Sequence, residues 1–209
     1  GISVIINLTT RDFFTPYSRS LLTLNIGENF GVEGEHLQYF GNNKNIALIP
    51  KFQLESFKIN TYNNFIKTGE YGLVNYKGEI KSEYSGSRSF TAGIGTRYEW
   101  RNFNPIIQSQ LDAKGRNAFL NSFLYFNLNT LNKKLYPTKG LKISSEFGFV
   151  YNQSQDVTFY SNGNPVTNTD SAGINYYNYQ RMSLAAEAYL PITHRFTFYS
   201  MLQTGINFN

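Results

Sequence analysis

The stretch SFTAGIGTRYEWR, residues 89–101, alternates so regularly that it decides the fold expected for the whole chain. Its even-numbered positions from Phe90 to Trp100 are apolar, aromatic or small, whereas Arg97, Glu99 and Arg101 occupy odd-numbered positions. Successive side chains of a β-strand point to opposite faces. The pattern therefore predicts a strand with one apolar face and one charged face.

The preceding stretch, residues 75–84, repeats this pattern and supplies charges that can pair with those of 89–101. One of its faces carries Lys77, Glu79, Lys81 and Glu83. If Glu79 lies opposite Arg97, Lys77 meets Glu99, whereas a shift by two residues brings Lys77 against Arg97. Cross-strand pairs of opposite charge contribute about 0.2–1 kcal/mol, so the sequence favours the first register.

Alternation of this kind recurs about ten times and predicts an all-β chain. The expected strands cover about 2–11, a stretch after FFTPYS through about 29, then 31–40, 45–58, 75–84, 89–101, 117–131, 138–152, 175–190 and 195–208. Closing Phe40 on Ile46 across the turn GNNKN places Glu35 opposite Lys51. Pro50 lacks a ladder donor, so either a bulge lies there or the strand boundaries differ.

The connections between these strands alternate in length. Short turns are expected near 12–18, 41–45, 85–89, 132–137 and 191–194, and longer segments at 59–74, 102–116 and 153–174; the short segment 27–31 breaks the rule. In a meander, the short turns then lie at one end and the long loops at the other. This layout is typical of an outer-membrane barrel, with short periplasmic turns and long extracellular loops.

Residues 136–151, YPTKGLKISSEFGFVY, show which solvent each face would meet. Apolar Leu141, Ile143, Phe147 and Phe149 share one face, which we expect to meet lipid. Lys142 and Glu146 share the other and should be paired across strands in a polar interior, because a charge near the bilayer midplane costs about 2–4 kcal/mol.

Aromatic residues gather near the ends of the expected strands, as interfacial girdles require. They are Phe13, Phe14, Tyr17, Tyr39, Phe40, Tyr98, Trp100, Tyr136, Tyr176, Tyr177 and Phe196. Aromatic residues make up 17% of the chain, and charged residues 16%, below the roughly 25% of soluble domains. The sequence thus predicts one membrane-embedded domain over residues 1–209.

Several functions lose support from composition and spacing. The net charge of +5 is not gathered into a basic stripe, so no nucleic-acid partner is expected. Cysteine is absent, and no apolar run is long enough for a transmembrane helix. His36 and His194 stand without partner clusters, GIGTRY at 93–98 lacks the third glycine of a dinucleotide fingerprint, and SGSRS at 85–89 lacks the spacing of a nucleophile elbow. We expect no catalytic residue, cofactor or metal.

The candidate site is the charged ladder, which we expect to line the barrel lumen: Lys77, Glu79, Lys81, Glu83, Arg97, Glu99, Arg101, Lys142 and Glu146. A salt-bridged interior explains the ladder best. Catalytic use of its carboxylates, as in glycoside hydrolysis, stays open from spacing alone, although nothing favours it.

Two blocks of sequence resemble the Omp85 superfamily, and most closely the barrel domain of patatin-like phospholipases. One is NLTTRDFFTPYSRSLLTLNIGEN at 7–29, followed by EHLQYFG. The other is NTLNKKLYPTKGLKIS at 129–144, with the turn motif Tyr136, Pro137, Thr138, Lys139 and Gly140. Here Asn129 and Asn132 stand where the family has acidic residues, which weakens any role for carboxylates in this turn.

The resemblance implies a sixteen-stranded antiparallel barrel in the outer membrane of a Gram-negative bacterium, preceded by patatin lipase and POTRA domains. The chain would supply about its second to eleventh strands and none of the lipase dyad. It would anchor or translocate an attached lipase domain, with membrane lipid, that domain, the remaining strands or a second copy as partners. The alternatives are an Omp85 assembly factor, a porin-like channel, and a soluble adhesin or carbohydrate-binding module.

Overall fold

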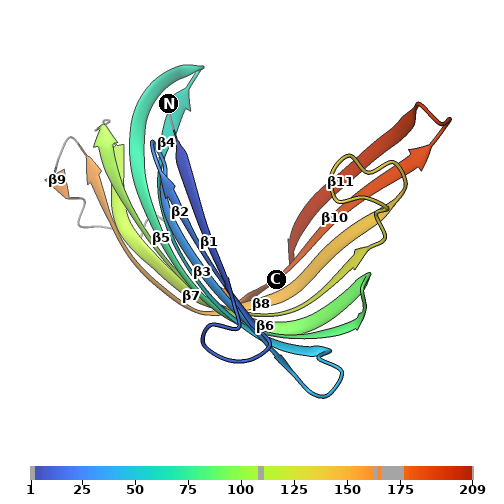
Figure 1. Cartoon of the computed structure of the whole chain (residues 1–209). Helices are drawn as coiled ribbons and strands as arrows, with labels where there is room; N and C mark the ends of the chain where they lie inside the picture. The colour runs from blue at the N-terminus through green and yellow to red at the C-terminus, as the bar shows by residue number, and fades with distance from the viewer. Residues whose placement is uncertain (1–2, 108–110, 162–163, 166–176, 209) are drawn as a thin grey trace.

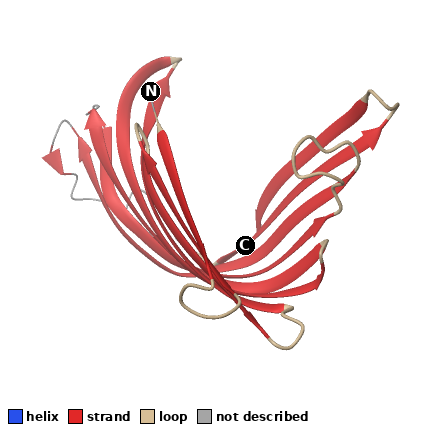
Figure 2. Ribbon diagram, viewed as in Figure 1, coloured by secondary structure: helices blue, strands red, loops and turns tan. Residues whose placement is uncertain are grey.

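The computed structural model describes residues 3–107, 111–161, 164–165 and 177–208, and these contain strands, turns and no helix (Figure 2). One antiparallel sheet runs in the order β1-β2-β3-β4-β5-β6-β7-β8-β10-β11, with β9 paired to β8. The strands are β1 (Val4–Arg11), β2 (Ser18–Ile26), β3 (Phe30–Phe40), β4 (Ile46–Asn63), β5 (Ile66–Ser87), β6 (Phe90–Ile107), β7 (Leu111–Asn129), β8 (Gly140–Ser161), β9 (Asn164–Pro165), β10 (Tyr179–Pro191) and β11 (Thr197–Phe208). The all-β, up-and-down fold expected from the sequence is confirmed.

The sheet bends into a deep trough rather than closing on itself (Figure 1). Strand β1 lies in one arm of the trough and β11 in the other, and among the described residues each pairs with a neighbour on one side only. We call the inside of the trough the concave face and its outside the outer face. The open edges of β1 and β11 thus leave two unpaired rows of backbone groups.

The strand registers match those expected from charge. Lys77 lies opposite Glu99 and Glu79 opposite Arg97. In the hairpin of β3 and β4, Phe40 pairs with Ile46 and Glu35 with Lys51. Register decides which face each side chain meets, so these pairings divide the charges from the apolar residues.

Two of the expected long loops are wrong, because paired strands extend into both segments; in the second, 108–110 lie outside the described residues. Strands β4 and β5 extend to a tight turn at Asn64 and Phe65, whose φ angles of 49° and 65° are those of a two-residue hairpin. Likewise β6 and β7 cover most of 102–116. In the third segment, β8 reaches Ser161, and the expectation for 162–163 and 166–174 lies outside the described residues.

Pro50 lies within β4 without a bulge, so neither explanation expected for it is correct. It pairs with Ile80 of β5, while the β3–β4 ladder keeps one register on both sides of it. That ladder has no pairs between Glu35↔Lys51 and Gln38↔Leu48. The β3–β4 ladder therefore accommodates Pro50, which has no backbone N–H, by a local gap in pairing rather than by a bulge.

Glycine on the concave face lets the sheet bend sharply. A Cβ atom on Gly95 would lie 2.6 Å from the Phe123 ring, and one on Gly93 would lie 2.3 Å from the Ser82 carbonyl oxygen. Aromatic rings of β7 therefore fill the space that side chains at these positions would need. The bend brings concave side chains together, which is why Phe123 is only 4% exposed.

Candidate functional site: an uncharged outer band and a concave charge network

The outer face carries a continuous band without Asp, Glu, Lys or Arg. On each strand the band consists of alternate residues, typified by Ile46 to Ser56 in β4, Val74 to Tyr84 in β5, Phe90 to Trp100 in β6, Ala118 to Leu128 in β7, Leu141 to Tyr151 in β8 and Gln180 to Leu190 in β10. Each of these stretches matches the 9–11 residues with which a tilted strand crosses a bilayer.

Charge returns to the outer face only past the band, towards the far ends of the long strands. Lys58 pairs with Glu70 at 3.3 Å, and Arg116 pairs with Asp156 at 3.3 Å. Hydrogen bonds and attraction from Lys67 and Lys58 lower the pKa of the Glu70 carboxyl. The strand extensions beyond the band are thus built for water.

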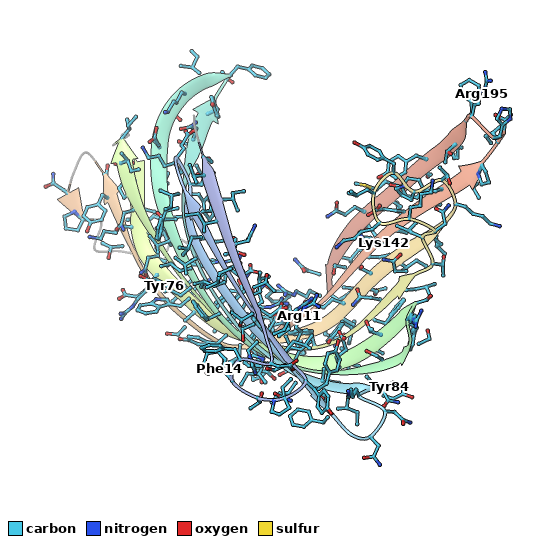
Figure 3. The ribbon with its side chains drawn as sticks, viewed as in Figure 1. Arg11, Phe14, Tyr76, Tyr84, Lys142 and Arg195 are labelled. Carbon is cyan, nitrogen blue, oxygen red and sulfur yellow. The ribbon has the colours of Figure 1, made fainter. Side chains whose placement is uncertain are left out.

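Exposure separates the two faces of the same strands. On the outer face Ile80, Ile94 and Leu124 are 60%, 59% and 58% exposed. On the concave face Glu99 is 2% exposed and Asn121 is fully buried. Figure 3 shows the same division, with Arg11 and Lys142 inside the trough and Tyr76 and Tyr84 outside it. The solvent of the outer face must therefore accept large apolar side chains.

Aromatic side chains border the band at both ends. Phe40, Tyr84 and Phe126 lie near the short-turn end, and Tyr76 and Trp100 stack at 5.4 Å near the other. This arrangement is typical of interfacial girdles. Of the aromatics expected there, Tyr39 instead lies on the concave face, packed against the buried cluster of Leu37, Ala47 and Ile49. Tyr176 lies outside the described residues.

The concave face holds a chain of ion pairs that crosses several strands. Arg97 of β6 donates from Nε to Glu79 at 2.5 Å and from both terminal nitrogens to Glu146 at 3.2 and 3.1 Å. Arg181 of β10 reaches the same Glu146 at 3.0 Å. Because Glu146 lies on β8, Arg97 spans the intervening strand β7, above whose Phe123 ring its guanidinium lies at 4.5 Å. The network ties β5, β6, β8 and β10 together.

The rest of the predicted ladder also lies on the concave face. Its contacts are Lys81 to Glu79 at 3.0 Å, Arg101 to Glu99 at 2.6 Å, Lys142 to Glu187 at 3.1 Å, Tyr125 to Glu83 at 3.1 Å and Lys77 to Gln53 at 3.3 Å. Lys142 and Glu146 are each paired across strands, as expected: Lys142 with Glu187, and Glu146 with Arg97 and Arg181. Lys77, although opposite Glu99, donates to a glutamine instead.

Four partners in this network were missed from the sequence: Gln53, Tyr125, Arg181 and Glu187. Each belongs to the charged face of its strand by alternation, so the signal was present for Arg181 and Glu187 in β10. Their partners on β8 could not be identified without the long connection between β8 and β10. Tyr125 gives no such signal, because aromatic residues occur on both faces.

The turn between β7 and β8 is held by Asn132. Its Oδ1 accepts hydrogen bonds from the backbone N–H groups of Thr138 and Lys139 at 3.0 and 3.1 Å, and its Nδ2 donates to Thr138 Oγ1 at 2.9 Å. Tyr136 is 89% exposed at the tip, and Gly140 has a φ of 122°. A carboxylate could accept the two backbone bonds, but only the amide can also donate.

The remaining observations restrict the chemistry of the described residues. Within them, no three His, Cys, Asp or Glu side chains gather as a metal site. No helical segment among them has the length and apolar character needed to cross a bilayer. No known family model matches the chain, and a comparison with curated proteins finds no match.

Proposed function

We propose that this chain forms part of the membrane-embedded wall of a β-barrel in the outer membrane of a Gram-negative bacterium. The observation that carries the proposal is the uncharged outer band of bilayer height, set against a concave face that holds the charge network. The function of such a wall lies in the solvents it separates, lipid outside and a polar interior inside.

A soluble adhesin or carbohydrate-binding module is the weaker explanation. Monomeric soluble proteins rarely expose a continuous apolar patch larger than about 300–600 Å². The outer band of this sheet includes exposed Ile80, Ile94 and Leu124 on three consecutive strands, with aromatic borders. In water such a surface would cause aggregation, whereas a membrane protein needs an apolar surface of this kind where it contacts lipid.

The bilayer also determines what must lie beside β1 and β11. Unpaired backbone groups in hydrocarbon cost several kcal/mol each, so spanning sheets close into barrels. The open edges therefore need further strands, from the same protein or from a second copy. The sixteen-stranded barrel implied by the resemblance would supply the first of these.

Within this class, we assign the chain to the Omp85 superfamily, as a barrel that anchors or translocates an attached patatin-like lipase domain. The support is the pair of sequence blocks. The second folds as a defined turn, although Asn132, which holds it, stands where the family has an acidic residue. Any lipase activity would reside in the attached domain, not in this wall. An assembly factor that inserts other barrels and a porin-like channel are the competing functions.

The lipid-facing claim can be tested with the single tryptophan of the chain, Trp100, which lies on the outer face beside Tyr76. The protein is reconstituted into liposomes whose acyl chains carry bromine, a contact quencher of indole fluorescence. We expect strong quenching of Trp100, and weak quenching of a W100F variant that carries a new tryptophan at concave Ala185. Equal quenching at both positions would refute the wall.

The competing functions differ in two further measurements. A porin-like channel predicts steady ion conductance in planar bilayers, and the absence of conductance would count against it. An assembly factor predicts POTRA repeats alone in the coding sequence upstream, whereas the lipase anchor predicts a G-x-S-x-G domain there.

A further inference from the structure

A groove interrupts the outer band across β1 to β7, from the β1–β2 turn to Tyr98 of β6 and Leu120 of β7. It has a volume of about 1140 Å³ and opens outwards. This exceeds slightly the roughly 300–1,000 Å³ typical of small-molecule sites. Its walls are apolar, with Leu8 and Leu22 on one side and Ile80 and Leu120 on the other.

The groove exists because small residues occupy outer positions where the rest of the band carries large ones. Gly78 forms an open part of its floor, because a Cβ atom built there would meet nothing within 4 Å. Gly34 also lines the groove, but the Phe52 ring lies over it, 2.1 Å from the position of a Cβ atom. Beside them, Ser20 Oγ and His36 Nδ1 form a hydrogen bond of 2.8 Å. The floor thus combines open space with one polar pair in an otherwise apolar surface.

The turn between β1 and β2 overhangs one end of this groove. Phe13 and Phe14 of that turn line the groove, and the Phe14 ring meets the His36 ring edge-on at 5.9 Å. Phe13 and Phe14 are nevertheless 73% and 70% exposed. The overhang covers the end of the groove that faces the membrane surface.

A cation is held beside the overhang. The Lys44 ammonium lies 3.5 Å from the ring centroid of Tyr17, a residue of the same β1–β2 turn. The short turns at this end of the sheet are basic, carrying Lys44, Arg88, Lys133, Lys134, Lys139 and Arg195 against the one acidic residue Asp12. Positive charge therefore collects where the headgroups of the adjacent leaflet would lie.

We propose that the groove binds one anionic phospholipid of the surrounding bilayer, with an acyl chain along Gly78 beside the Phe52 ring and the phosphate near Lys44. This inference rests on the proposed membrane location. Apolar walls select the hydrocarbon chain, and charge complementarity at the basic rim selects an anionic headgroup over a zwitterionic one. The Ser20–His36 pair, between these two parts, can hydrogen-bond an ester oxygen.

Native mass spectrometry of the detergent-purified protein tests this site, with phosphatidylglycerol and phosphatidylcholine offered at equal concentration. We expect at least tenfold more bound phosphatidylglycerol. Gly78→Ile should abolish most of that binding, because the new side chain fills open floor without a clash and suits a strand. Ala92→Ile, a similar enlargement of the outer face outside the groove, should leave binding unchanged.

The headgroup is tested separately by charge reversal at the rim. Lys44→Glu should remove the preference for phosphatidylglycerol, whereas Lys139→Glu, the same reversal in the β7–β8 turn, should keep it. Glycerol phosphate without acyl chains should not compete. Equal retention of both lipids, no lipid retained, loss of preference in both lysine variants, or competition by glycerol phosphate would each overturn the site.

Failure of this inference is distinguishable from failure of the proposed function. If Trp100 is quenched by brominated lipid while Gly78→Ile binds phosphatidylglycerol like the unmodified protein, the wall stands and the groove site falls. If Trp100 is not quenched, both fall.

Discussion

The outer and concave faces of this sheet belong to the same strands and differ by one step along the chain. From Phe90 to Trp100 the outer face lacks charge, while the concave face places Arg97 and Glu99 among their partners. The backbone ladder is common to both, so it cannot explain the difference. The faces differ only in their side chains and in the surroundings that these side chains require. Each substitution below changes a side chain of one face so that it no longer suits those surroundings.

The largest effect should come from breaking the concave network at its centre. Arg97→Met removes one partner from Glu79 and one from Glu146. Glu146 keeps its pair with Arg181, whereas Glu79, which is 6% exposed, keeps only its pair with Lys81. Removing one member of a buried ion pair costs about 3–5 kcal/mol. Equilibrium unfolding by urea in liposomes measures it.

The matched control for that prediction is Arg116→Met. Its pair with Asp156 is exposed, at 62% and 67% of the side-chain surface, and such pairs are worth about 0–1 kcal/mol. If both arginine variants lose the same stability, the two faces do not differ in the way described.

A charge moved onto the outer band should have the next largest effect. Ile94→Lys places an ammonium within the uncharged band, at a cost of about 2–4 kcal/mol near the bilayer midplane. Ile106→Lys lies on the same face beyond the band and should cost about 0–1 kcal/mol. The difference in cost between Ile94→Lys and Ile106→Lys should shrink when the protein is refolded without lipid. Equal costs in liposomes would show that the outer band around Ile94 does not lie in the bilayer.

The turn at 130–139 sharpens the comparison at the border between the faces. Asn132→Ala removes the side-chain oxygen that accepts hydrogen bonds from the Thr138 and Lys139 N–H groups, and should lower the free energy of unfolding by about 1–2 kcal/mol. Asn132→Asp keeps an acceptor for Thr138 and Lys139 but loses the amide donor to Thr138 Oγ1. It should therefore lose less than the alanine variant. If Asn132→Asp lowers the stability as much as Asn132→Ala, the stabilising contact is the hydrogen bond that the Asn132 amide donates to Thr138 Oγ1.

The smallest effect concerns pH at the water-facing strand extensions. Lys67 and Lys58 lower the pKa of Glu70 in the folded chain, so the carboxylate stabilises the fold above its unfolded pKa, about 4.3. That contribution is lost as the pH falls below 4.3 and through the folded pKa. A carbon-13 NMR titration should place the Glu70 midpoint below 4.3.

Replacing both lysines, as Lys58→Met and Lys67→Met, should return the Glu70 midpoint towards 4.3. An unmoved midpoint would show that neither lysine holds the carboxylate in solution.

The sequence predicted the strands and their faces well, because alternation and charge pairing are local signals. It failed at the far ends of β4 to β8, where Asn, Tyr and Gly resemble loop residues although pairing with a neighbour continues. It also missed the reach of Arg97 across β7 to Glu146, since that contact depends on the bend of the sheet. The outer groove was hidden for the same reason: its lining residues, such as Leu22, Gly78 and Leu120, lie far apart in sequence and come together only after β1 to β7 pair.

The bridge from Arg97 to Glu146 has a mechanical consequence. A sheet bends most easily about an axis parallel to its strands, and a tie from β6 to β8 opposes the opening of that angle at β7. Around β2 to β4, the ion pairs join neighbouring strands only, as Arg19 does with Glu35 and Lys51 with Glu33. The sheet is therefore stiff through β5 to β10 and compliant towards β1, so a force that widens the trough would bend it first beside the β1 edge.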